Sequence, residues 1–288
     1  MNNAIQINGI CKHYQDFSLQ NVSFCVPGGC IMGFIGENGA GKTTTLKALL
    51  GLIHLNAGSV QVLGKNPVTQ RREINADIGV VMDGSFFYEG IHTKDIAPVM
   101  RRLHKNWDDA LFVDYCKRFS LPLEKTIKDY SKGMKAKLAL TVALSHHPKL
   151  LILDEATSGL DPVVRNEMLD IFMEFISDEE HTILLSSHIT SDLEKIADYI
   201  TFIHQGKIVF TMPKDEMLET YGIVKCSKTD VEKLDAAHII GRRDSKFDVE
   251  VLIDNKQQVR RSLPSLLLES TTIDDIMTFF AQKGGYDA

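Results

Sequence analysis

Cysteine is scarce in this sequence, and the cysteines follow no pairing pattern. The 288 residues include five, at positions 11, 25, 30, 116 and 226, and no two form a C-x-x-C pair. Disulfide scaffolds and structural zinc sites both need cysteines at recurring spacings. The sequence therefore indicates neither, and scattered thiols fit a reducing, cytosolic compartment best.

Long hydrophobic runs and an excess of positive charge are also missing. No apolar run approaches the roughly 20 residues that a helix needs to cross a bilayer, and the N-terminus lacks the profile of a signal peptide. If the protein works at a membrane, another subunit must span it. The formal net charge of −6 argues against a dominant nucleic-acid-binding surface.

The sequence does contain a glycine-rich loop, GENGAGKTT, at residues 36–44. The loop fills every fixed position of the pattern G-x-x-x-x-G-K-[ST], which cradles nucleotide phosphates. Apolar residues 30–35 before it predict a buried strand, and residues 43–50 after it predict a helix, which is the context that the motif needs. The alternative is a glycine-rich turn that matches by chance. The loop makes a nucleoside triphosphate the first ligand to consider.

Each part of this loop has a role in phosphate binding. Gly36, Gly39 and Gly41 let backbone N–H groups converge on phosphate at a helix N-terminus, where the dipole favours negative charge. Lys42 supplies a positive charge for the outer phosphates, and Thr43 offers its hydroxyl to a magnesium ion. The predicted ATP-binding residues of the loop are completed by Asn38, Ala40 and Thr44.

A second motif, LLILDEAT at residues 150–157, is an apolar strand that ends in two carboxylates. Neighbouring side chains of an extended chain point to opposite faces, so Asp154 and Glu155 can do different work. We expect Asp154 to face a magnesium ion and Glu155 to act as the base for an attacking water. The alternative is that a carboxylate caps the following helix.

Further polar groups follow these strands. The sequence SGLD lies at residues 158–161, and His188, flanked by serine, follows a strand predicted at residues 182–186. Ligands of open α/β sheets bind at the carboxyl ends of the strands. These residues are therefore candidates for the same site.

The hydrophobic pattern of residues 1–221 predicts one α/β domain. Alternating residues at 5–10, 22–26, 59–63 and 78–81 predict an antiparallel start, and helical spacing predicts an insertion over about residues 84–147, with helices within 93–119 and at 134–144. The remaining elements alternate between strand and helix, which predicts a largely parallel sheet. They are strands at 150–154, 182–186 and 199–204, and helices at 163–176 and 190–197.

Two histidines, His146 and His147, follow the predicted helix at 134–144. They have no partners at the spacing of metal ligands. We expect them at the helix end, where a protonated imidazole interacts favourably with the helix dipole.

Residues 222–288 predict a second, small α+β domain that begins near Gly222. Short strands are predicted near residue 224 and at 238–241 and 249–253, followed by a helix at 273–282. No motif in this domain indicates a ligand.

Together these motifs resemble the ATP-binding subunits of ABC (ATP-binding cassette) transporters over about residues 1–220. The resemblance implies a P-loop NTPase core of ABC type with an antiparallel β subdomain and a helical subdomain. It implies that Tyr14, in KHYQDF, stacks on adenine, with Phe17 as the fallback. YSKGM at residues 130–134 stands where the family signature LSGGQ belongs, and Ser131 and Gly133 match its serine and second glycine.

The resemblance also implies a head-to-tail dimer of two identical or two different ATPase subunits. Ser131 and Gly133 then contact the terminal phosphate of ATP held by the opposite subunit, and the loop that contains Asp161 crosses the interface. His188 senses the terminal phosphate. Dimer closure on ATP in this family drives integral-membrane permease subunits, so the resemblance implies a position at the cytoplasmic face of the cell membrane, with ATP and Mg²⁺ as ligands.

Two positions depart from the family pattern. Lys132 replaces a glycine of the signature, and its ammonium either adds charge near the nucleotide or points into solvent. Asp83, in IGVVMD, stands where the family has a glutamine that contacts magnesium, so a metal role for Asp83 stays open. Both departures resemble the branch that exports antibiotics and peptides, including the phenol-soluble-modulin exporters.

The aromatic residues Phe86, Phe87 and Tyr88 lie where such ATPases receive the coupling helices of the membrane subunits, although core packing is the alternative. A different function class is a soluble cassette ATPase that remodels a nucleic-acid or ribosomal complex. The absence of a long coiled coil between the two motifs, and of a second cassette, argues against it. A cassette that binds nucleotide without turnover is disfavoured by the intact Lys42 and Glu155.

Overall fold

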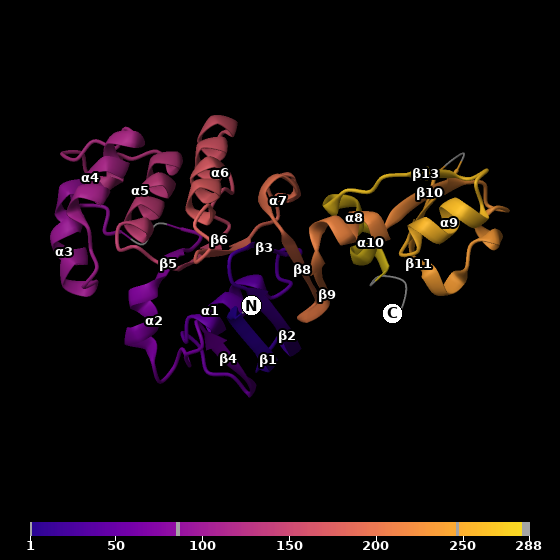
Figure 1. Ribbon diagram of the computed structural model, residues 1–288, viewed down its shortest axis with the longest axis horizontal. Helices are drawn as coiled ribbons and strands as arrows, with labels where there is room; N and C mark the ends of the chain where they lie inside the picture. The colour runs from indigo at the N-terminus through magenta and orange to yellow at the C-terminus, as the bar shows by residue number, and fades with distance from the viewer. Residues whose placement is uncertain (1, 85–86, 246–247, 284–288) are drawn as a thin grey trace.

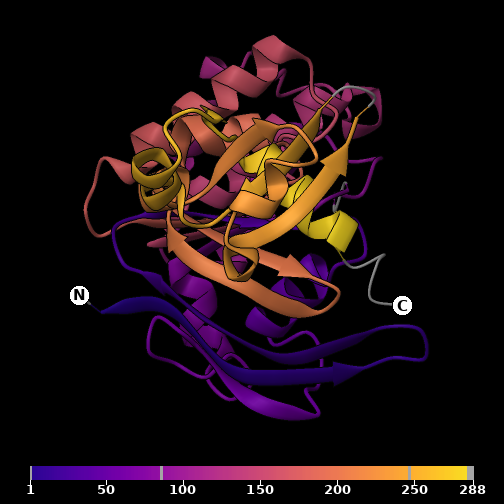
Figure 2. The same cartoon turned by 90° about the vertical axis from the view of Figure 1, so that its right-hand side faces the viewer.

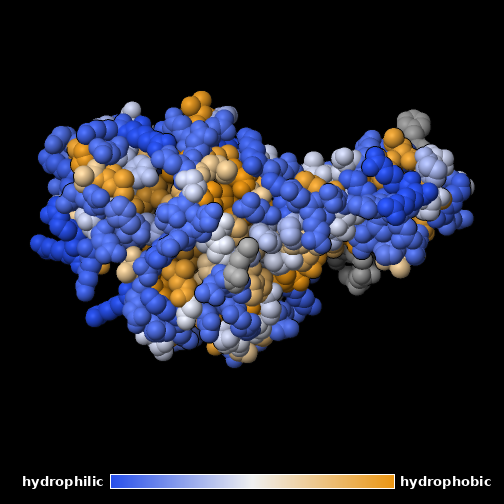
Figure 3. Space-filling view, viewed as in Figure 1, coloured by the Kyte–Doolittle hydropathy of each residue, from blue (hydrophilic) through white to orange (hydrophobic). Residues whose placement is uncertain are grey.

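Three sheets organise the chain in the computed structural model, which describes residues 2–84, 87–245 and 248–283. Figure 1 shows the main body, built on the two N-terminal sheets, and a smaller unit at the C-terminal end of the long axis. The same view in Figure 3 shows hydrophobic residues at the surface between the lobe of α3 to α5 and the lobe of the antiparallel sheet.

The first sheet is antiparallel, with the order β2-β1-β4. It consists of β1 (Asn3–His13), β2 (Ser18–Pro27) and β4 (Ala57–Val62). Alternate residues such as Ile5, Ile7 and Val62 are buried, as the period of two in the sequence predicts.

The second sheet is the mainly parallel one predicted from the sequence, and its order is β5-β6-β7-β3-β8-β9. Its strands are β3 (Ile31–Ile35), β5 (Ile78–Val81), β6 (Leu150–Asp154), β7 (Thr182–Ser186), β8 (Tyr199–His204) and β9 (Lys207–Pro213). Only β9 is antiparallel, because a two-residue turn with positive φ at Gln205 and Gly206 returns the chain beside β8.

Helices lie on both faces of this sheet and in the insertion between β5 and β6 (Figure 1). They are α1 (Lys42–Leu49), α2 (Arg71–Asp77), α3 (Ile96–Leu103), α4 (Asp109–Arg118), α5 (Lys132–Leu144), α6 (Pro162–Ile176), α7 (Thr190–Ile196) and α8 (Lys214–Thr220). Short 3-10 turns lie at Thr93–Asp95 and Ile127–Asp129. Successive residues of β6 serve opposite faces: Leu151 packs in the core with α5 to α7, whereas Ile152 packs with α1 and the antiparallel sheet.

The third sheet is small and antiparallel, with the order β11-β12-β10-β13. It contains β10 (Gly222–Cys226), β11 (Ile239–Asp244), β12 (Val249–Ile253) and β13 (Leu267–Glu269), with 3-10 turns at Val231–Lys233 and Ala236–His238 and helices α9 (Lys256–Ser262) and α10 (Ile273–Lys283). Figure 2 shows this sheet in front of the main body. Helix α10 returns to that body, since Ile276 and Phe279 are buried in the same core as Phe202.

Within the described ranges, no helix combines the length and the hydrophobicity that a membrane span requires.

Candidate functional site

The glycine-rich loop joins β3 to α1, as the motif predicts. A Cβ atom at Gly36 would lie 2.4 Å from the carbonyl oxygen of Ile203, and one at Gly41 would lie 2.6 Å from Leu19 and 2.9 Å from Phe17. Gly41, at the N-cap of α1, has a φ of 113°, which only glycine adopts readily. No side chain among the described residues caps the first N–H groups of α1, so they can bind an anion.

Lys42 lies inside the loop and is only 6% exposed. Its Nζ donates hydrogen bonds to the carbonyl oxygens of Gly36, at 2.6 Å, and Glu37, at 3.2 Å. The same Nζ lies 3.6 Å from Oε1 of Glu155. The loop therefore holds a positive charge between its own carbonyl groups and the end of β6.

Asp154, the last residue of β6, is buried beside the loop. Its Oδ2 accepts a hydrogen bond from the hydroxyl of Thr43 at 2.9 Å, while its Oδ1 is buried without a hydrogen-bond partner among the described residues. A hydroxyl and a carboxylate with a free oxygen are the kinds of ligand that Mg²⁺ prefers. The residues present thus fit a magnesium ion at this point.

Glu155 and His188 meet at the ends of β6 and β7, which are neighbours in the sheet. The Oε2 of Glu155 lies 2.5 Å from Nδ1 of His188. Glu155 has a φ of 52°, an unusual conformation for glutamate, and its N–H donates to the carbonyl of Ser186 at 2.9 Å. The turned backbone directs the Glu155 side chain toward the phosphate loop.

A cavity of about 480 Å³ connects these groups. The predicted residues that line it are Asn38, Gly39, Gly41, Lys42, Thr43, Thr44, Asp83, Glu155 and His188, together with Phe17, Glu37 and Ser158. Gly36 and Asp154 lie directly behind it, through their bonds to Lys42 and Thr43. Ala40 is buried in the core beneath the loop.

The aromatic residue at this cavity is Phe17 rather than Tyr14. Tyr14 is 47% exposed, and the Nζ of Lys12 lies 5.2 Å from its ring centroid. The ring of Phe17 packs against Gly41 at the start of α1. The geometry of the single chain thus favours the fallback residue for contact with a base.

Ser131, Gly133 and Asp161 do not line this cavity. Ser131 caps α5 by accepting a hydrogen bond from the N–H of Met134, and Asp161 caps α6 by accepting from Val163 and Val164. Gly133 lies against Val164. The Nζ of Lys132 lies next to Gly159, where a Cβ atom would be 2.5 Å away from it.

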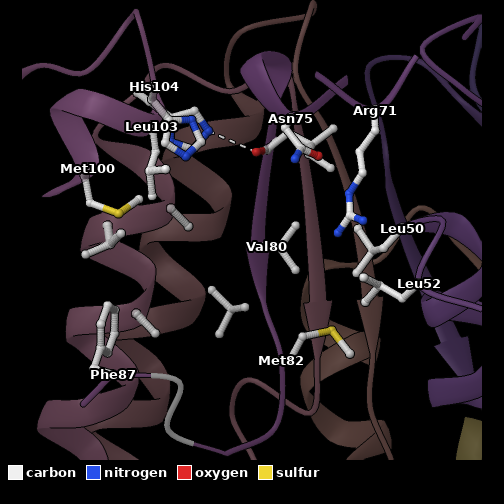
Figure 4. Close-up of a pocket in the computed structure, with 16 residues that line it drawn as sticks. Leu50, Leu52, Arg71, Asn75, Val80, Met82, Phe87, Met100, Leu103 and His104 are labelled. Carbon is white, nitrogen blue, oxygen red and sulfur yellow. Dashed lines mark hydrogen bonds between the residues drawn. The ribbon is translucent and has the colours of Figure 1, made fainter. Parts of the chain in front are cut away.

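A second cavity, of about 420 Å³, lies between β5, α2 and α3. Figure 4 shows Val80, Met82, Met100, Leu103 and Phe87 around it, with Arg71 and Asn75 at one side. Leu52 and Leu103 are 50% and 69% exposed at its rim. Tyr88 is 78% exposed nearby in the chain, and Phe86 lies outside the described residues.

Two histidines form one end of this second cavity. The rings of His104 and His146 have centroids 4.0 Å apart, and both Nδ1 atoms are buried without a hydrogen-bond partner among the described residues. Burial and the neighbouring His146 lower the pKa of His104 to about 4, and burial also lowers the pKa of His146. His146 does follow the end of α5, as expected, but its ring is buried in the core, where the lowered pKa disfavours the protonated form that would interact with the helix dipole.

Sequence reasoning missed a buried polar pair behind the site. The hydroxyl of Thr157 donates to Oδ2 of Asp192 at 2.9 Å, and both residues are buried. Thr157 and Asp192 match no motif spacing in the sequence. Their contact joins parts of the chain that are 35 residues apart.

The sequence is similar to those of known proteins. The family model described as ABC transporter matches residues 19–158. The bacitracin transport ATP-binding protein BcrA of Bacillus licheniformis is 34% identical over 75% of this chain and 72% of its own length. The lantibiotic transport ATP-binding protein SrtF of Streptococcus pyogenes is 35% identical over 73% of this chain and 91% of its own length.

A solved structure gives the same fold. It is described as an ATP-binding subunit of an ABC transporter and superposes with a TM-score of 0.67, at 24% identity, over 75% of this chain and 92% of that one.

Proposed function

This chain belongs to the ATP-binding proteins of the ABC transporter family, and from that premise we propose that it hydrolyses ATP to power export through separate membrane subunits. The relatives named for bacitracin and lantibiotic transport support a peptide, antibiotic or similar amphipathic molecule as the cargo. The observation that carries the proposal is the convergence of Lys42, Glu155 and His188 on one cavity beside the phosphate loop.

The residues divide the work of hydrolysis. The free N–H groups of α1 and the ammonium of Lys42 bind the phosphates. Glu155 orients a water and accepts its proton as the water oxygen bonds to the terminal phosphorus and the bond to the leaving ADP oxygen breaks. His188 holds the Glu155 carboxylate through Nδ1, and we infer that it donates to the terminal phosphate, because it lines the same cavity.

Thr43 and Asp154 would hold the magnesium ion, which supplies positive charge to the phosphate oxygens when bound. Asp83 lines the same cavity but is exposed, so we assign it no ligand role.

We infer that two chains, identical or different, act together. Ser131, Gly133 and Asp161 stand at the ends of helices outside the cavity of their own chain. They are thereby available to a nucleotide held by a partner. The ring of Phe17, three residues after Tyr14 in the sequence, contacts the adenine base.

The apolar cavity between β5 and α3 is the proposed docking place for the membrane subunits. Its exposed leucines and Phe87 offer an apolar surface to an amphipathic segment of a permease. The chain would then work at the cytoplasmic face of the cell membrane.

The proposal is tested by co-expressing the chain with membrane proteins encoded nearby and measuring phosphate release from the purified complex. We expect ATP-dependent release that the membrane subunits stimulate. A chain that binds no nucleotide would contradict the proposal.

A further inference from the structure

Behind the Glu155–His188 contact lies a second link between the same two segments, and the hydrolysis scheme does not use it. The hydroxyl of Thr157 donates to Oδ2 of Asp192 at 2.9 Å. We propose that Thr157 and Asp192 form a positioning pair that holds Glu155 against His188. This inference rests on the proposed ATPase function, because it concerns the geometry of the same site.

The position of the pair in the chain supports this role. Thr157 follows Glu155 by two residues, and Asp192 lies in the first turn of α7, four residues after His188. The segment after β6 and the segment after β7 are therefore joined by two side-chain contacts. One link is the Glu155–His188 contact itself, and the other is the buried hydroxyl–carboxylate bond.

Burial shields this bond from water. Thr157 is 0% exposed and Asp192 is 1% exposed, so water does not compete for the bond. Asp192 is flanked by the buried Leu193, and its Oδ1 has no hydrogen-bond partner among the described residues. A buried carboxylate with one unpaired oxygen lowers the stability of the fold. Such a cost is expected where the residue positions a functional group, here Glu155.

The backbone of Glu155 needs such support. A non-glycine residue with a φ of 52° persists only when the surrounding structure holds it in place. The N–H of Glu155 donates to the carbonyl of Ser186, and its carbonyl accepts from the N–H of Ser158 at 3.0 Å. The Thr157–Asp192 bond then anchors this turn to α7. Without that anchor, the turn shifts relative to α7 and the Glu155 carboxylate moves away from Nδ1 of His188.

The test uses variants that remove or retain the hydrogen bond. Thr157→Val and Asp192→Ala remove it, whereas Thr157→Ser and Asp192→Asn retain a donor or an acceptor. We expect the first two to lower kcat about tenfold with the KM for ATP within about twofold, and the last two to stay near wild type. The double variant should lose no more than either single one, because both act through one contact.

Thr201→Val is the matched control for a buried threonine. Thr201 is fully buried in β8, and its hydroxyl lies 3.1 Å from that of Thr211, away from the site. We expect it to lower the melting temperature without lowering kcat. If Thr157→Val does not fold, Thr157→Cys keeps the volume, weakens the bond and should give an intermediate kcat. An unchanged kcat in Thr157→Val or Thr157→Cys, or a loss equal to that of Thr201→Val, would overturn the inference.

A spectroscopic measurement separates this inference from the ATPase proposal. In protein labelled with ¹⁵N-histidine, His188 is assigned by comparison with His188→Ala. We expect the Nδ1 signal of His188 to show the bond to Glu155 in the wild type and to lose it in Thr157→Val. An unchanged signal would count against the positioning pair even in a chain without turnover, whereas absent turnover with the expected signal change would count against the ATPase proposal alone.

Discussion

The carboxylate of Glu155 contacts the imidazole of His188 through one oxygen, at 2.5 Å, and lies 3.6 Å from the ammonium of Lys42 through the other. Three strand ends supply the three residues: Lys42 follows β3, Glu155 follows β6 and His188 follows β7. These strands are adjacent in the sheet, in the order β6-β7-β3. The site is thus a consequence of parallel strands ending at one edge.

Replacing Glu155 tests its role as the base. We expect Glu155→Gln to lower kcat by roughly 100- to 1000-fold, because the amide accepts no proton from water, while ATP binding is retained. A closed dimer should accumulate with ATP, which size-exclusion chromatography would detect. Glu124→Gln, on an exposed surface, is the control, and near-normal turnover of Glu155→Gln would remove Glu155 from the mechanism.

Replacing Lys42 should affect binding itself. The Lys42→Ala variant loses the charge that the loop holds for the phosphates, so we expect the affinity for ATP to fall by roughly tenfold or more, consistent with a charge-assisted hydrogen bond. Lys47→Ala removes an exposed lysine from the same helix and serves as the control. Equal ATP affinities of the two variants, measured by titration calorimetry, would contradict this role.

The half-buried His104 predicts a pH dependence of stability. Its pKa is about 4 in the folded chain, against an ordinary value near 6.5. The unfolded chain therefore binds a proton more readily, and the free energy of unfolding should fall as the pH is lowered from about 6.5 toward 4.

Urea unfolding at pH 7 and pH 5 checks the contribution of His104. We expect His104→Phe to show a smaller loss between the two pH values than the wild type. His54→Phe, at an exposed histidine, should behave like the wild type. Identical losses in all three proteins would show that His104 does not contribute.

If the membrane subunits dock at the apolar cavity, their affinity for this chain should depend on the residues at its rim. Leu103→Glu places a charge on its rim, and we expect the affinity for those subunits to fall by roughly tenfold or more, because an unpaired charge in an apolar interface is unfavourable. ATP binding by the free chain should not change. Leu267→Glu, at an exposed leucine of β13, is the control in co-purification, and equal recovery of both complexes would exclude this docking place.

Sequence patterns predicted the central elements closely. The strands β5, β6, β7 and β8 have the predicted bounds because each is a short apolar run buried on both faces. The elements that were missed are α2, α8, α9, β9 and β13. Most are short and largely exposed, so their sequences carry no clear hydrophobic period.

The sequence by itself determined the chemistry of this protein. A loop that needs glycine at fixed positions, and a buried strand that ends in Asp154 and Glu155, are local requirements written in adjacent residues. The tertiary structure alone decided which residues meet: Phe17 rather than Tyr14 lines the cavity, the ring of His146 is buried against His104, and Thr157 bonds to Asp192. These outcomes depend on strand order and on burial, which bring together residues whose separation along the chain carries no signal.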